Sequence, residues 1–218
     1  MARATADSPR MFKSDWLDAG SRTHWSVVPL LYLPAATGAF AYARAGAEVG
    51  WAAGLSLAAV GFVAWTLAEY WLHRTLFHWQ PPGALGSRVH FLLHGVHHQW
   101  PKDRYRLVMP PAVSIIYYLV SLGLFYWLLG PRLVWAFHAG FVLGYVFYDL
   151  SHYYLHHGRP KGSYLRRLQR HHLLHHYQDD SLRFGVSNMI WDRVFCTDRS
   201  RAPEPGAHPS NRWAKSRS

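Results

Sequence analysis

The chain has 218 residues and a mass of 25.1 kDa, a length that suits one domain with a sizeable core. Half of its residues are hydrophobic and 16% are aromatic, so the chain is too apolar to remain intrinsically disordered. It carries a formal net charge of +11 and one cysteine, Cys196, which excludes a disulfide scaffold and a thiolate zinc finger. Any bound metal must therefore be held by histidine or carboxylate groups.

The first 24 residues are polar and lack the apolar core of a signal peptide. Four apolar stretches follow, and each is close to the length of about 17–25 residues that a membrane-spanning helix needs. A single stretch of this kind fits a buried helix of a soluble protein, but four stretches with almost no charge favour four transmembrane helices. We therefore expect an all-α integral membrane protein. Its transmembrane helices are predicted at residues 25–43, 49–72, 107–129 and 133–150.

The polar ends of the chain are expected to be tails. The membrane domain is predicted to cover residues 25–198, between an N-terminal tail at 1–24 and a basic C-terminal tail at 199–218. Residues 1–20 and 199–218 are rich in Ser, Pro, Arg and Ala, and we expect them to be poorly ordered.

Basic residues are distributed unevenly between the two sides that four crossings would create. Only Arg44 and Arg132 fall in the two short connections on one side, so 21 of the 23 basic residues lie on the other side. The positive-inside rule makes that other side cytoplasmic. We predict a cytoplasmic cap formed by residues 73–106 and 151–198, whose charge faces anionic lipid headgroups and not nucleic acid. The membrane would be the bacterial inner membrane, or the endoplasmic reticulum in a eukaryote.

Thirteen of the 16 histidines lie in two windows of the predicted cap, residues 73–98 and 152–176. Two HxxHH motifs place three imidazoles each on one helix face, because residues i, i+3 and i+4 are neighbours on a helix. His73 and His78 are five residues apart, so we expect the helix to end or loosen between them. Ten imidazoles from four segments are too many for one ion and suit two ions with about five nitrogens each, of a metal such as iron or zinc. These ten are His73, His78, His94, His97, His98, His152, His156, His172, His175 and His176.

Two carboxylates lie close to these motifs. Glu69 precedes His73 by one helical turn, and Asp149 precedes His152 by three residues. Each could accept the outward N–H of a ligand ring and fix its tautomer, or could simply be a charge at a helix end.

Six other histidines do not fit the spacing of the motifs and are not expected to be ligands: His24, His90, His138, His157, His171 and His208. An unstructured, metal-sequestering loop would also be rich in histidine. In this chain the histidines alternate with Leu, Phe, Tyr and Trp at helical spacing, which argues against such a loop.

Four segments resemble the fatty acid hydroxylase superfamily of membrane-bound di-iron oxygenases, and in particular the fatty acid 2-hydroxylases that act on the acyl chains of sphingolipids. They are EYWLHRTLFH (69–78), HFLLHGVHHQWPKDRYRLVMPP (90–111), YDLSHYYLHH (148–157) and HHLLHHYQDDSLRFGVSNMIWDRVF (171–195). The resemblance implies that the same ten histidines are the metal ligands. By analogy with related desaturases, one ion would bind His73, His78, His94, His98 and His175, and the other His97, His152, His156, His172 and His176.

The resemblance also implies an activity, which is O2-dependent 2-hydroxylation of fatty acyl chains, in sphingolipids, ceramides or free fatty acids, by a monooxygenase with two iron ions. Zinc also binds imidazole sites, so a purified sample can contain zinc in place of iron. Many eukaryotic members carry a cytochrome b5 domain, and the stretch before Trp25 is too short for one. A separate cytochrome b5-like or ferredoxin-like protein is therefore expected to supply electrons.

Two alternatives stay open. The first is the same metal chemistry on a sterol, a carotenoid or an alkane. The second is a metal transporter, which should place ionisable residues near the middle of the membrane. In this chain only His138 lies there.

Residues around the motifs are candidates for substrate contact. Five aromatic residues could line an acyl tunnel or form a belt at the membrane interface: Trp71, Phe77, Trp79, Trp100 and Tyr153. Four basic residues could meet a polar headgroup or simply lie beside the membrane: Arg74, Lys102, Arg104 and Arg106.

Overall fold

The computed structural model describes residues 8–198, and every helix or strand assigned in that range is a helix. The predicted all-α class is therefore confirmed. Residues 1–7 and 199–218, and with them His208, lie outside the described residues.

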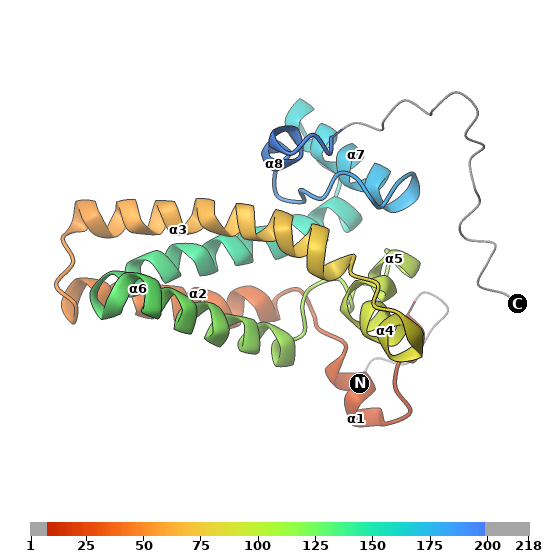
Figure 1. Ribbon diagram of the computed structural model, residues 1–218, viewed down its shortest axis with the longest axis horizontal. Helices are drawn as coiled ribbons and strands as arrows, with labels where there is room; N and C mark the ends of the chain where they lie inside the picture. The colour runs from red at the N-terminus through yellow and green to blue at the C-terminus, as the bar shows by residue number, and fades with distance from the viewer. Residues whose placement is uncertain (1–7, 199–218) are drawn as a thin grey trace, which may run out of the picture.

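Four helical arms lie side by side in a bundle (Figure 1). They are α2 (Val27–Ala45), α3 (Trp51–Trp71) and the two arms of α6 (Pro111–His157). By length and hydropathy, the stretches Trp51–Phe77 and Pro111–His157 qualify as candidate membrane-spanning helices. The predicted stretches thus coincide with the arms of the bundle, and the third and fourth belong to one interrupted helix.

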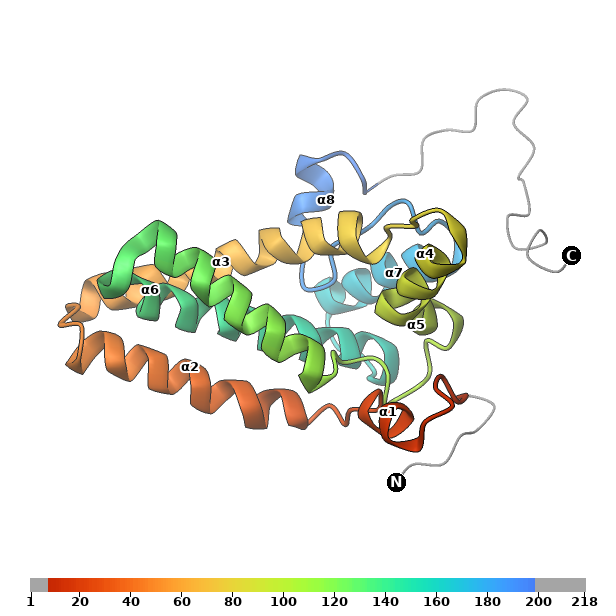
Figure 2. The same cartoon turned by 60° about the horizontal axis from the view of Figure 1, so that its bottom comes forward.

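Helix α6 folds back on itself at Gly130. This glycine has a φ of 72°, in the left-handed region that other residues rarely adopt, and Pro131 begins the second arm. The Ser121 hydroxyl of the first arm lies 3.0 Å from Nε2 of His138 in the second. The two arms therefore run antiparallel, as Figure 2 also shows.

Helix α3 packs against the second arm of α6 at very close range, because each of the two helices presents a glycine to the backbone of the other. A Cβ atom on Gly140 would lie 1.8 Å from the carbonyl oxygen of Ala58, and one on Gly61 would lie 2.0 Å from that of Phe137. Trp65 lies next to this contact and is only 2% exposed. Small residues of this kind allow the close helix packing on which association in a membrane depends.

The outer surface of the bundle is apolar. Large hydrophobic side chains that are more than half exposed occur on every arm of the bundle except the second arm of α6, and they include Leu30, Leu55, Val60, Ile116, Val120 and Trp127. Exposed apolar side chains in this number are suited to contact with lipid and not with water.

Shorter helices form a cap at one end of the bundle (Figure 1). The π-helix η1 (Leu72–Phe77) continues α3 directly. The remaining helices of the cap are α4 (Gly83–His90), the π-helix η2 (Phe91–Gly95), α5 (Val96–Gln99), α7 (Ser163–Tyr177) and α8 (Ile190–Val194).

The N-terminal segment is folded onto the cap from residue 8 onwards, so the expectation of poor order is wrong for residues 8–20. Helix α1 (Asp15–Gly20) carries Asp18, whose carboxylate accepts hydrogen bonds from Arg22 Nε at 3.2 Å and from Arg106 Nη2 at 3.1 Å. The Ser8 hydroxyl donates to Asp103 at 2.6 Å. These buried polar contacts attach the segment to the loop before α6.

Candidate metal centre

The four histidine-bearing segments meet at the cap end of the bundle. Their rings form two groups, and within each group the candidate ligand nitrogens all lie within 4.8 Å of one another. The first group contains His73, His78, His94, His98 and His175, and the second contains His97, His152, His156, His172 and His176. The membership of both groups is the one that the family resemblance implied.

The π-helix η1 explains how His73 and His78 reach the same group. On a straight α-helix, residues five apart point about 140° away from each other. A π turn instead bonds an N–H to the carbonyl five residues earlier, and the N–H of His78 lies 3.3 Å from the carbonyl oxygen of His73. Their ring centroids are 5.0 Å apart. The predicted loosening of the helix between these residues is confirmed.

The distances between ring nitrogens fit a shared metal ion. In the first group, Nε2 of His94 lies 3.1 Å from Nε2 of His73 and 3.0 Å from Nε2 of His98. In the second group, Nε2 of His172 lies 2.8 Å from Nε2 of His156 and 3.1 Å from Nε2 of His176. Two nitrogens that bind one ion at about 2.0–2.1 Å, at a right angle to each other, are separated by about 3 Å.

Unpaired nitrogens in the second group also indicate that its rings share a metal ion. His97 Nε2 and both ring nitrogens of His152 are buried and have no hydrogen-bond partner within residues 8–198. Buried polar atoms are normally paired, because leaving one without a partner costs free energy. A cation between these rings would satisfy the nitrogens that face it.

The protonation state of the rings also suits metal binding. Burial, reinforced by the neighbouring imidazoles, lowers the pKa of His98 to about 2 and the pKa of His78 to about 3. The same causes hold the pKa values of His94 and His97 well below the ordinary value. A neutral ring keeps the lone pair that a metal requires.

Two rings of the first group are oriented by backbone carbonyl groups. His73 Nδ1 lies 2.6 Å from the carbonyl oxygen of Phe184, and His175 Nδ1 lies 2.6 Å from that of Leu182. Because a carbonyl only accepts, each Nδ1 must carry the proton, which leaves Nε2 free to bind a metal.

Glu69 and Asp149 are buried, and of the two roles considered for them, direct contact with a ligand ring is not found within residues 8–198. Glu69 accepts hydrogen bonds from the backbone N–H groups of Val186, at 2.7 Å, and Ser187, at 2.8 Å. Asp149 accepts from the N–H of Met109 at 3.2 Å and from a tyrosine hydroxyl. These N–H groups lie outside the helices and have no helical carbonyl group as partner. Because a buried N–H must be paired, the two carboxylates serve as their acceptors.

Within residues 8–198, the histidines outside the motifs lie outside both groups. His138 packs between the arms of α6, bonded to Ser121. His171 Nε2 lies 3.0 Å from Oδ2 of Asp192, a fully buried carboxylate. Asp192 was not among the residues predicted from the sequence, although it lies in the segment 171–195 that carries the resemblance. That segment was the one available signal for its importance.

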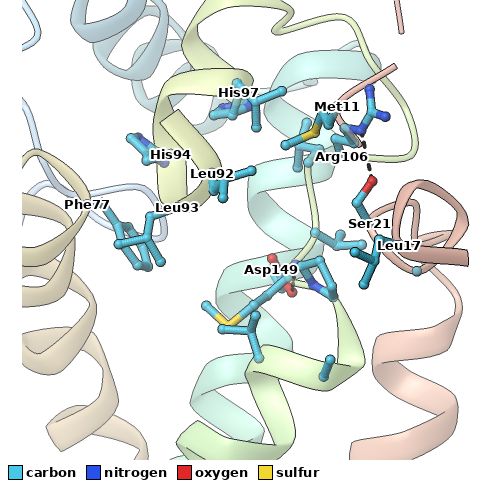
Figure 3. A pocket seen from close by; sticks show the side chains of 18 of the residues that line it. Met11, Leu17, Ser21, Phe77, Leu92, Leu93, His94, His97, Arg106 and Asp149 are labelled. Carbon is cyan, nitrogen blue, oxygen red and sulfur yellow. Dashed lines mark hydrogen bonds between the residues drawn. The ribbon is translucent and has the colours of Figure 1, made fainter. Parts of the chain in front are cut away.

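A cavity of about 400 Å³ lies beside both groups (Figure 3). His94 of the first group and His97 and His152 of the second line it. The rest of the wall is mainly apolar and comes from α1, η1, η2, the loop before α6 and both arms of α6, and it includes Leu17, Phe77, Leu92, Leu93, Met109 and Val113. Of the five aromatic residues considered as tunnel lining, only Phe77 lines this cavity, whereas Trp71 and Trp79 are exposed.

Arg106 also lines the cavity, but its guanidinium group is already paired. It lies 3.1 Å from a carboxylate oxygen of Asp18 and 3.4 Å from one of Asp103. Arg106 therefore fixes α1 as the outer wall of the cavity, and a role in headgroup contact is not supported. Lys102 and Arg104 are exposed.

Comparison with known proteins identifies relatives that match most of this chain. Residues 58–197 match the model of the family described as fatty acid hydroxylase. The chain is 38% identical to the dihydroceramide fatty acyl 2-hydroxylase FAH2 of Arabidopsis thaliana, over 88% of this chain and 80% of the relative. It is 40% identical to the ceramide very long chain fatty acid hydroxylase SCS7 of Saccharomyces cerevisiae, over 84% of this chain and 48% of that protein. The chain thus spans about half the length of the yeast relative.

A solved structure is similar as well. The structure titled full length scs7p, in which only the hydroxylase domain is visible, superposes with a TM-score of 0.82 at 39% identity. The match covers 88% of this chain and 72% of that one.

Proposed function

The chain belongs to the fatty acid hydroxylase family, and we propose that it hydroxylates a fatty acyl chain at C2, the carbon next to the carbonyl group, with a sphingolipid such as a ceramide as substrate. One observation carries this proposal beyond the family match. His94 of the first group and His97 and His152 of the second line one mainly apolar cavity, so that an acyl chain in the cavity would reach both groups.

The two groups would each hold one metal ion, through the ten histidines already named. When bound, a pair of iron ions would supply the redox chemistry by which O2, two electrons and two protons convert a C–H bond into C–OH and water. Zinc binds imidazole as well, so a purified sample can contain zinc.

The chain's own residues bind and place the substrate. Leu92, Leu93 and Met109 would contact the acyl chain in the part of the cavity that lies next to His94 and His97. The apolar wall excludes water from the reacting carbon. Helix α1 closes the outer side of the cavity, because Asp18 is bonded to Arg106.

We further propose that α2, α3 and both arms of α6 cross the membrane and that the cap lies on its cytoplasmic side. The apolar outer surface of the bundle supports the crossings, and the concentration on the cap side of 15 of the 17 basic residues within residues 8–198 supports the orientation. The lipid substrate would then enter from the cytoplasmic leaflet.

The two electrons would come from a separate electron-transfer protein on the cytoplasmic side. The exposed face of α7 carries Arg166, Arg167 and Arg170, and residues 158–170 contain no acidic residue. An acidic carrier of the cytochrome b5 or ferredoxin type would be attracted to this surface.

Lipid analysis tests the proposed reaction. A host that expresses the chain should accumulate 2-hydroxyacyl sphingolipids, and the variants His97→Ala and His175→Ala should lose the product at least 100-fold, because each removes a ligand from one group. His138→Ala, a histidine outside both groups, should keep most of the activity. Mass spectrometry of the lipid extract measures all four samples. Full activity of the His97 variant, or a hydroxylated sterol, carotenoid or alkane as the product, would contradict the proposal.

A further inference from the structure

We propose that residues 182–187, the anchor loop, determine the affinity of the first metal site, and that Glu69 and Asp192 are positioning residues that act on this site through the loop. The inference rests on the proposed function only in that the histidine groups bind metal ions.

The anchor loop connects directly to two of the five rings of the first group. The carbonyl groups of Leu182 and Phe184 accept the Nδ1 protons of His175 and His73, both at 2.6 Å. Such bonds fix the tautomer and orientation of a ligand ring and raise its basicity. A displacement of the loop would therefore turn both rings away from the ion.

Asp192 holds the first half of the loop. Its Oδ1 accepts the N–H of Phe184 at 2.8 Å and the hydroxyl of Thr197 at 2.7 Å. Its Oδ2 accepts the N–H of Gly185 at 2.7 Å and the Nε2 proton of His171 at 3.0 Å. The carboxylate is 0% exposed, so these four donors surround it completely.

Glu69 holds the second half of the loop from the end of α3. Its Oε1 accepts the N–H groups of Val186 and Ser187 at 2.7 and 2.8 Å, and its Oε2 accepts the Ser187 hydroxyl. Between the two carboxylates lies Gly185, where a Cβ atom would be 2.1 Å from the carbonyl oxygen of Asn188. The backbone of the loop is thus fixed on both sides and leaves no room for a side chain at its centre.

The second group has no comparable support. Nδ1 of His152, His172 and His176 is buried without a hydrogen-bond partner anywhere in residues 8–198. None of these rings is oriented by a carbonyl of the anchor loop. A change at Glu69 or Asp192 should therefore weaken the first site and leave the second site unaffected.

The test measures zinc affinity at each site separately, in the purified full-length chain. His172→Ala removes a ligand of the second site and leaves the first to be measured, whereas His175→Ala leaves the second. Adding Asp192→Asn or Glu69→Gln places an amide N–H2 group against backbone N–H donors. In the His172→Ala background each addition should weaken Zn²⁺ binding about 10–100-fold, measured by competition with a chelator. In the His175→Ala background, binding should stay within about twofold of the unmodified background.

Matched controls separate this effect from a general loss of stability. Glu48→Gln and Asp15→Asn make the same chemical changes at exposed carboxylates outside the metal groups and should change neither affinity. Ser187→Ala deletes a single donor to Glu69 and should weaken only the first site, which keeps the test valid where Asp192→Asn fails to fold.

An equal loss of affinity at both sites, or no loss at the first, would overturn the positioning role while leaving the metal centre in place. Zinc affinities at both sites that His172→Ala and His175→Ala leave unchanged, or no bound zinc in the wild-type chain, would overturn the ligand assignment itself, and the inference with it.

Discussion

Ten imidazole rings lie close together and are mostly buried. The protonation state of each ring therefore affects both metal binding and the stability of the fold. A proton on any of these rings would place a positive charge in a poorly solvated site next to other rings, and for this reason their pKa values are lowered. The same property gives nitrogens that are ready to bind a metal near neutral pH. It also makes the metal-free protein sensitive to acid.

The metal-free protein should lose stability as the pH falls below about 6.5, the ordinary pKa of histidine. In the folded state His78 and His98 have pKa values of about 3 and about 2, so between these values and about 6.5 only the unfolded chain takes up protons at these rings. Their contribution is complete above pH 6.5 and is lost progressively toward pH 2–3. Thermal unfolding of the metal-free protein should occur at least several degrees lower at pH 5.5 than at pH 7.5. An unfolding temperature that does not depend on pH over this range would show that the rings are not held neutral by the fold.

The sequence alone identified the candidate ligands and Glu69, but not Asp192 or the loop to which both carboxylates bond. The HxxHH motifs lie on helices, where spacing determines which rings share a face, so the two triplets can be recognised without a structure. The partners of Glu69 are 117 and 118 residues away along the chain, and Asp192 bonds to a histidine 21 residues away. Contacts of this kind depend on how a loop without periodicity folds, and local spacing carries no information about them.

At the scale of elements, the π-helix η1 determines where two of the histidines point, and glycines allow α3 and α6 to pack closely. The π-helix η1 brings His73 and His78 onto one side, and the i, i+5 spacing indicated that the helix had to change there. The Gly130–Pro131 turn agrees with the predicted boundary between two apolar stretches. Helix α1 was not predicted, because a helix of six residues is stabilised mainly by tertiary contacts, here the buried pairs of Asp18.

Two glycine substitutions on α6 test the packing, and their expected effects on stability have opposite signs. Gly140→Leu should destabilise the bundle by about 1–3 kcal/mol or more, because the side chain would collide with the backbone of α3 at Ala58. Gly123→Ala should raise stability by about 0.5–1 kcal/mol, because nothing lies within 4 Å of the added Cβ and alanine favours a helix. Unfolding in detergent, followed by circular dichroism, measures both variants. Equal effects of the two substitutions would show that α3 and α6 do not approach as closely as described.

At the scale of the whole molecule, the bundle and the cap have different roles. The bundle presents an apolar exterior, the cap contains the histidine groups, and the cavity lies where α1, η1, η2 and both arms of α6 meet. The four apolar stretches and the two histidine windows could be predicted, because hydropathy and spacing are local properties. The cavity wall could not, because it is formed by side chains from the N-terminal segment and from three regions far apart in the sequence.

The measurement that tests the central claim most directly is the number and position of metal ions in the purified full-length chain. Elemental analysis should give two transition-metal ions per chain, and anomalous scattering from a crystal should locate one ion within each group of five histidines. A single ion shared by both groups, an ion elsewhere in the cap, or a folded protein that binds none would contradict the account.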